Sequence, residues 1–171
     1  HPSMANNELS GPIVLASLAK DLLLNRNHYY SYRFVLLPET IGSIAYLSKN
    51  YQELKENVVA GFNLSCVGDN GPFSFMPSRN GQTLSDRVLK NILKTIDPGY
   101  KTYSYLKNRG SDERQYCSPG IDLPVSSFMR SKYGEYVEYH TSLDNLEFIS
   151  GEGLFSSYKV MQCVFEAIEN N

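Results

Sequence analysis

Hydrophobic residues recur at helical spacing in four segments of the chain. The first spans residues 10–25 and opens with a proline in its first turn, where the missing N–H costs no hydrogen bond. The second, over residues 84–96, follows residues that can cap a helix, and the third closes the chain over residues 154–168. A shorter segment over residues 41–49 is the fourth. The pattern therefore predicts four helices.

Short β-rich runs alternate with these helices. They span residues 32–37, 58–67, 100–106 and 123–128, and turn-forming residues bound most of them. Strands that alternate with helices predict an α/β fold, here a three-layer α/β/α sandwich with a mostly parallel or mixed sheet. In such sheets ligands bind beyond the carboxyl ends of the strands, so the polar residues that follow the strands are the candidates for a site.

Composition narrows the range of partners. Of the 171 residues, 42% are hydrophobic, which is enough for the core of one domain. The formal net charge is -2, so we expect no nucleic acid to bind this segment. No apolar run reaches the roughly 18 residues that a membrane span needs, so we expect no membrane partner either.

The cysteines and the first residues suggest where the chain belongs. Cys66, Cys117 and Cys163 are an odd set without C-x-x-C spacing, which indicates a reducing compartment, and we expect a cytoplasmic protein. Residues 1–3 have neither an initiator Met nor the pattern of a signal peptide. We therefore expect residues 1–171 to form the C-terminal portion of a single domain whose N-terminal portion is missing. The oligomeric state is not predicted.

Two of the three histidines lie in polar, turn-rich segments close to carboxylates. His1 precedes Asn7 and Glu8 by one loop, and Asp144 follows His140 at a spacing that allows it to orient the imidazole. Imidazoles and carboxylates gathered at one sheet edge are what a zinc site requires. Capping of a helix or a local hydrogen bond is a competing explanation of His140, and the residues alone leave both open.

Glu39 stands directly after an apolar run that ends at Pro38. At a metal site such a carboxylate serves as a ligand or as the general base on bound water. Capping of the helix that follows is the competing explanation. The interpretation of the polar loop over residues 109–114 is left undecided in the same way, because water alone can solvate its charges. The G-x-S-x-G pattern is absent, which disfavours a serine hydrolase.

Five segments resemble, in the same order, the motifs of the co-catalytic zinc aminopeptidases, glutamate carboxypeptidases and glutaminyl cyclases. They are Asn7-Glu8-Leu9-Ser10-Gly11, Pro38-Glu39-Thr40-Ile41-Gly42-Ser43, Asn63-Leu64-Ser65-Cys66-Val67-Gly68, Ser111-Asp112 with Gly120-Ile121-Asp122-Leu123-Pro124, and Tyr139-His140-Thr141-Ser142-Leu143-Asp144. The fuller segments resemble a bacterial subgroup described as aminopeptidase-like. The resemblance spans nearly the whole chain, and its evidence is the order of the motifs.

The resemblance implies a phosphorylase/hydrolase-like zinc exopeptidase fold and a metal-dependent hydrolase of N-terminal amino acids or related small amides. In that role Glu39 would be the general base on zinc-bound water, and Asp112 would anchor the hydrogen bonds near the metal. Arg114 and Tyr139 would contact a small peptide or aminoacyl substrate. The metal-ligand positions implied by the resemblance fall on His1, Asn7, Glu8 and His140.

Three positions depart from the superfamily pattern. The bridging aspartate falls on Asn7, a later ligand aspartate falls on Ser65, and the paired glutamates are reduced to Glu39, which takes the base or the ligand position depending on the alignment. We therefore expect one zinc ion rather than two. The alternative is a catalytically inactive aminopeptidase-like domain that serves in binding or as a scaffold, for example in polysaccharide biosynthesis.

Overall fold

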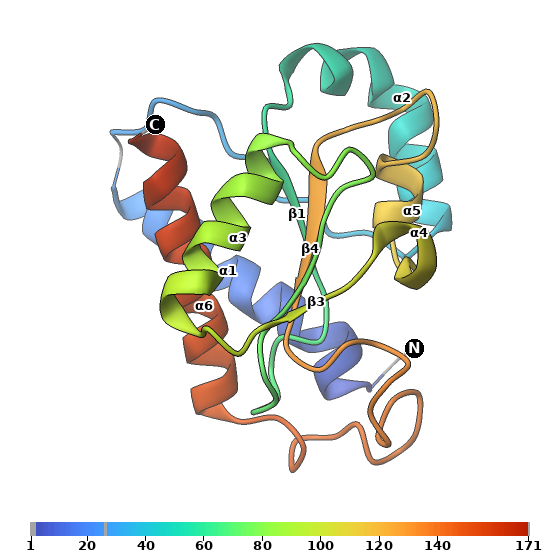
Figure 1. The fold of residues 1–171 in the computed structure, drawn as a ribbon, viewed down its shortest axis with the longest axis vertical. Coiled ribbons are helices and arrows are strands. Elements are labelled where there is room, and N and C mark those ends of the chain that lie inside the picture. The colour runs from blue at the N-terminus through green and yellow to red at the C-terminus, as the bar shows by residue number, and fades with distance from the viewer. Residues whose placement is uncertain (1–2, 26, 171) are drawn as a thin grey trace.

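A mixed four-stranded sheet forms the centre of the computed structural model, which describes residues 3–25 and 27–170 (Figure 1). The strands are β1 (Gly61–Leu64), β2 (Ser74–Met76), β3 (Lys101–Thr102) and β4 (Val125–Met129), in the order β1-β4-β2-β3. β4 runs parallel to β1 and antiparallel to β2, and β2 runs parallel to β3. All five residues of β4 are buried, as expected of a central strand covered on both faces.

Helices cover both faces of this sheet. One layer contains α1 (Ser10–Leu24), α3 (Leu84–Ile96) and α6 (Gly151–Glu169), and the other contains α2 (Ile41–Asn57), α4 (Tyr105–Asn108) and α5 (Glu113–Tyr116) (Figure 1). A single π-helical turn, η1 (Ala5–Leu9), leads directly into α1. The predicted three-layer sandwich is therefore confirmed.

Each layer has its own apolar core. Val14, Leu18, Leu89, Leu93 and Val164 pack with Phe128 of β4 on the α1, α3 and α6 side. On the α2, α4 and α5 side the cluster includes the following residues: Leu47, Leu54, Met76, Tyr105, Cys117, Val125 and Met129. The alternation along β4, with Phe128 on one face and Met129 on the other, follows from the two-residue period of a strand.

Two helix starts are set by local chemistry. Thr83 and Asp86 form a capping box at α3, where each side chain accepts a hydrogen bond from the backbone of the other. Ser150 caps α6 through the N–H of Gly153. Gly153 packs so closely on the carbonyls of Gly68 and Asp69 that a Cβ would lie well inside van der Waals contact of both. The start of α6 is thereby fixed against the chain that follows β1.

The structure corrects several of the predicted elements. Residues 32–37 belong to no strand, although they are rich in residues that favour strands. The predicted strand over residues 100–106 is reduced to β3, followed at once by α4, and β2 was not predicted because only three residues pair. α2 continues to Asn57, beyond the predicted end at residue 49, because its second half is polar and turns only Leu54 inward. Among the described residues, no helix has the length and hydropathy needed to cross a membrane.

Candidate functional site

The candidate site lies at the carboxyl ends of β1 and β4. Because these strands are parallel, the chain leaves both at the same edge of the sheet, and the N–H of Arg130 donates to the carbonyl of Cys66 at 2.8 Å. The start of α1 joins them there, since the N–H of Val67 donates to Ser10 Oγ at 3.0 Å. This edge is where α/β sheets bind ligands.

Two buried aspartates hold η1 at this edge. Asp144 accepts hydrogen bonds from the N–H groups of Asn6 and Asn7, at 2.6 and 3.1 Å. Asp69 accepts from Asn6 Nδ2 at 2.8 Å and from Ser131 Oγ at 2.8 Å. Asp144 therefore positions the backbone of η1, and Asp69 holds the side chain of Asn6 against Ser131.

Asn7 stands in a connected hydrogen-bond network. Its Nδ2 donates to Glu8 Oε1 at 2.9 Å, and its Oδ1 accepts a bond from Cys66 Sγ at 3.7 Å. Tyr136 Oη lies 3.4 Å from both Cys66 Sγ and Asp144 Oδ2. Burial raises the pKa of the Cys66 thiol to about 11, so Cys66 stays protonated at neutral pH. We call Asn6, Asn7, Cys66, Tyr136 and Asp144 the amide side of the site.

Glu39 and Asp112 lie on the other side. Asp112 Oδ1 accepts the N–H of Thr40 at 2.7 Å, and Arg114 Nη2 donates to Thr40 Oγ1 at 3.2 Å. Thr40 has a φ of 62°, a left-handed conformation that is strained for a β-branched residue, and these bonds hold it. α2 begins at this turn without a side-chain cap, so the structure does not support helix capping as the role of Glu39.

The pKa values of both carboxyls are raised. Glu39 is exposed as a residue, but partial burial of its carboxyl raises its pKa, and the charges of Asp112 and Glu8 add to this effect, while the Ser111 hydroxyl and Arg114 oppose it. Burial likewise raises the pKa of Asp112, against the hydrogen bond from Thr40. We call Glu8, Glu39 and Asp112 the carboxylate side of the site. Groups of one charge brought together in this way are common at active sites.

Tyr139 and His140 border the carboxylates. The Tyr139 pKa is raised by burial and then by the nearby Cys66, Glu39 and Glu8, which places this ring beside both sides of the site. His140 stacks on Tyr139, with ring centroids 3.8 Å apart, and it has a φ of 56° in an exposed turn. The bonds of Asp144 run to η1 and to Tyr136.

The structure thus gathers most of the residues that the sequence singled out. Asn7, Glu8, Glu39, Asp112 and Tyr139 share one edge, with Arg114 next to Thr40. His1 lies outside the described residues. The predicted roles of these residues stay predictions.

The described residues do not fit a zinc site by themselves. In residues 3–25 and 27–170, no three His, Cys, Asp or Glu side chains are grouped closely enough to hold a metal ion. The amide of Asn7 and the hydroxyl of Ser65 occupy positions where the resemblance places carboxylates, and neutral oxygens are weak ligands for zinc.

Glu113 is a functional candidate that the sequence did not reveal. It lies in the charged run over residues 109–114, which is typical of a solvated loop, yet its side chain is fully buried. Tyr133, which donates to it at 3.0 Å, stands 20 residues further along the chain. No local pattern links two residues at this separation, so sequence spacing carried no signal.

A family model described as "Domain of unknown function (DUF4910)" matches residues 1–171. The chain belongs to the DUF4910 family. A Clostridium acetobutylicum protein is 44% identical over 171 residues, which are 100% of this chain and 38% of that protein, and its name assigns it to polysaccharide biosynthesis with an aminopeptidase-like domain. The DUF4910 chain therefore spans about two fifths of the length of the relative it matches.

Solved structures show the same fold. The crystal structure of a Clostridium acetobutylicum protein named as a peptidase matches with a TM-score of 0.94 and 43% identity, over 100% of this chain and 40% of that chain. A zinc aminopeptidase from Bacillus subtilis matches with a TM-score of 0.77 and 21% identity, over 95% of this chain and 42% of that chain. The DUF4910 chain thus has the fold of the zinc exopeptidases, as its motifs implied.

Proposed function

We propose that this DUF4910 chain carries the proton-transfer side of an aminopeptidase-like hydrolase that acts on N-terminal amino acids or related small amides. The supporting observation is the raised pKa of Glu39, which lies near Asp112, Glu8 and Tyr139 at the carboxyl edge of the sheet. A carboxylate with a raised pKa is a better base than an ordinary one, and its acid form is more available near neutral pH.

In this proposal Glu39 takes a proton from the attacking water and gives it to the leaving amine. Asp112 and Arg114 fix the turn at Thr40, so that the carboxylate of Glu39 keeps one position at the carboxyl edge of the sheet. Tyr139 forms a wall for the substrate, and the exposed guanidinium of Arg114 is placed to meet a substrate carboxylate. Because the described residues do not fit zinc, the proposed chemistry of this chain is limited to proton transfer and substrate contact.

The test is hydrolysis of aminoacyl anilides by the full-length protein. Glu39→Gln removes the base while keeping the shape of the side chain, and we expect kcat to fall about a hundredfold or more. Glu56→Gln, at an exposed position on α2, is the matched control and should leave kcat unchanged. Full activity in Glu39→Gln would refute the assignment.

A non-catalytic binding domain is the second candidate. It is favoured by the amide side, where Asn7 and Cys66 bond each other at the position of a bridging metal ligand. The name of the Clostridium relative, which combines polysaccharide biosynthesis with an aminopeptidase-like domain, agrees with such a role. The domain would then bind an aminoacyl ligand without cleaving it. This candidate would be supported if the wild-type protein bound an aminoacyl ligand and Arg114→Ala weakened that binding, while neither protein hydrolysed any aminoacyl anilide tested.

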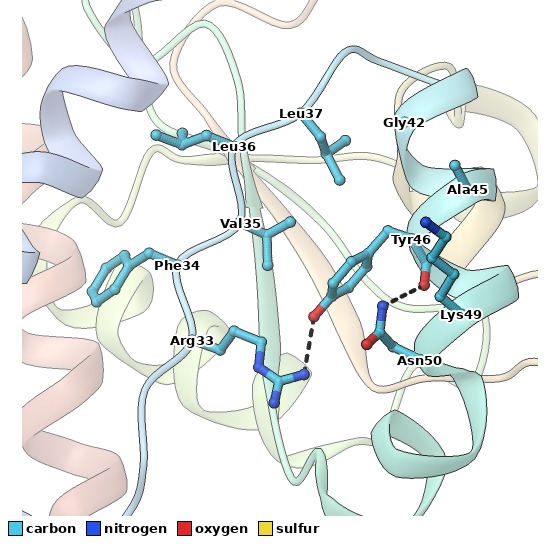
Figure 2. A pocket seen from close by; sticks show the side chains of 10 residues that line it. All are labelled: Arg33, Phe34, Val35, Leu36, Leu37, Gly42, Ala45, Tyr46, Lys49 and Asn50. Atoms are coloured by element: carbon cyan, nitrogen blue, oxygen red, sulfur yellow. Dashed lines mark hydrogen bonds between the residues drawn. The ribbon is translucent and has the colours of Figure 1, made fainter.

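We also propose that residues 1–171 form one portion of a larger domain, and the surface over residues 9–44 supports this. Of the fifteen exposed large hydrophobic residues that the structure describes, eight lie in this stretch, including Leu23, Leu24, Leu36 and Ile41. An open groove of about 460 Å³ lies between residues 33–37 and α2, and Figure 2 shows the side chains that line it. Within the described ranges, β1 pairs with a strand on one side only, namely β4.

Exposed apolar side chains gathered in this way are typical of a surface that packs against another part of a protein. In the full-length protein we therefore expect residues 31–44 to be protected from hydrogen exchange, and fast exchange there would contradict the proposal.

The three cysteines are free thiols, which suits a reducing compartment, and we propose the cytoplasm as the location of the protein.

A further inference from the structure

Glu113 is a buried carboxylate that is satisfied entirely by neutral donors. The side chain is fully buried, and no ion pair within the described residues involves it. Its Oε1 accepts from Gly110 N at 2.7 Å, Ser111 N at 3.0 Å and Tyr133 Oη at 3.0 Å, and its Oε2 accepts from Asn63 Nδ2 at 3.1 Å and Ser127 Oγ at 3.3 Å. Five hydrogen bonds compensate for the water that a buried charge loses.

The five donors come from four parts of the fold. Two are backbone N–H groups of the loop before α5, one is on β1, one is on β4, and one is in the segment after β4. Glu113 therefore ties this loop to the two parallel strands whose ends form the site. Gly110 adds a packing contact, since a Cβ there would lie 2.6 Å from the Tyr133 ring.

The loop held in this way contacts the Glu39 turn from the side. Asp112 accepts the N–H of Thr40, and the Ser111 hydroxyl hydrogen-bonds Glu39. Arg114, one residue beyond Glu113, reaches Thr40 Oγ1. A shift of the loop would therefore release Thr40, whose positive φ needs external support.

We propose that Glu113 is a positioning residue that fixes the loop over residues 110–112 against the sheet and thereby holds the Glu39–Thr40 turn in place. Glu113 itself lies beneath the site and acts on Glu39 only through Ser111 and Asp112. The inference rests on the proposed function only where it names Glu39 as the group that is positioned.

The test is Glu113→Gln in the full-length protein, followed by NMR and hydrogen exchange. The amide group of Gln keeps the volume but turns an NH2 toward groups that are themselves donors. The Thr40 amide proton, which now bonds a carboxylate, should move upfield, and exchange over residues 38–42 and 110–113 should become about tenfold faster. Exchange in α3 and α6 should stay as in wild type, and Glu56→Gln should change none of these signals.

Tyr133→Phe is the second variant, because it removes one of the five donors and keeps the ring on Gly110. It should move the Thr40 signal in the same direction by a smaller amount, and it decides the question if Glu113→Gln does not fold. An unchanged Thr40 amide in the folded variants would overturn the proposal. Equal acceleration in α3, α6 and residues 38–42 would also overturn it, since Glu113 would then merely stabilise the core.

These readouts need no catalytic activity, so they separate the two proposals. A shifted Thr40 amide in a protein that cleaves no anilide would support the positioning role and refute the hydrolase. If hydrolysis depends on Glu39 but is unchanged in Glu113→Gln, and the Thr40 amide signal does not shift in that variant, the hydrolase is supported and the positioning role is refuted.

Discussion

The two sides of the candidate site differ in what their polar groups do. On the amide side, Asn6, Asn7, Cys66, Tyr136 and Asp144 bond one another, and the backbone of η1 uses the carboxylate of Asp144. On the carboxylate side, Glu39 and Asp112 have raised pKa values at a partly open surface. The comparison indicates that the amide side is built for rigidity and that the capacity for proton transfer lies on the carboxylate side.

The largest expected effect is on the stability of the amide side. Asp144→Ala leaves two backbone N–H groups of η1 without their acceptor, and we expect the free energy of unfolding to fall by about 3 kcal/mol. Asp112→Ala removes one bond and one poorly solvated charge, so its cost should stay below about 1 kcal/mol. Denaturant unfolding of both variants measures the difference, and equal losses would remove the distinction between the two sides.

The support beneath the amide side gives the second prediction. Gly153→Ala places a methyl group against the carbonyls of Gly68 and Asp69, and we expect a loss of about 2 kcal/mol. Gly151→Ala, where no atom lies within 4 Å of the added Cβ, is the matched control. The thermal midpoints of both variants should therefore separate clearly. If they coincide, the contact of α6 with the chain after β1 is not tight.

Asn7→Asp gives the third prediction, because it brings a carboxylate to the amide side. The new charge is close to Asp144 and Glu8, so we expect the metal-free protein to lose stability and the affinity of the full-length protein for zinc to rise about tenfold. Equilibrium dialysis with metal analysis measures the affinity, and we expect at most one zinc ion per wild-type molecule. Asn50→Asp, in the groove of Figure 2, is the control. An unchanged affinity would show that the site is not formed around Asn7.

The smallest effect concerns pH and the carboxylate side. A carboxyl whose pKa is raised by folding destabilises the protein when it is ionised, and this penalty disappears as the pH falls through the raised pKa toward the ordinary value. Glu39→Gln should therefore be more stable than wild type at pH 7 by a few tenths of a kcal/mol, after allowance for solvent screening. The gain should vanish below about pH 4. Unfolding curves at both pH values check this, and a gain that grows on acidification would contradict the raised pKa.

Much of the fold could be predicted from the sequence, because it depends on local patterns. The amphipathic stripes of α1, α3 and α6 and the polar break after each run give the layered order directly. The wrong predictions of strands also have physical causes. Residues 32–37 have strand composition but no strand partner within the described chain, and β2 is too short for its pattern to stand out.

The candidate site was predictable only in part. Glu39, Asp112 and Tyr139 could be singled out from the sequence because they lie in segments that resemble the family motifs. The role of Asp144 in holding η1 spans 138 residues, and the burial of Glu113 depends on Tyr133 and on two strands, so neither has a local signal. Long-range hydrogen bonds of this kind become visible only when the sheet has brought the segments together.

The central claim is that proton transfer at this site belongs to Glu39. The most direct test is the pH dependence of kcat/KM for aminoacyl anilide hydrolysis by the full-length protein and by its Glu39→Gln variant. We predict an acidic limb in the wild type with an apparent pKa above 4.5, the ordinary value for a glutamate, and the loss of that limb together with most of the activity in the variant. An identical profile in both proteins would contradict the account.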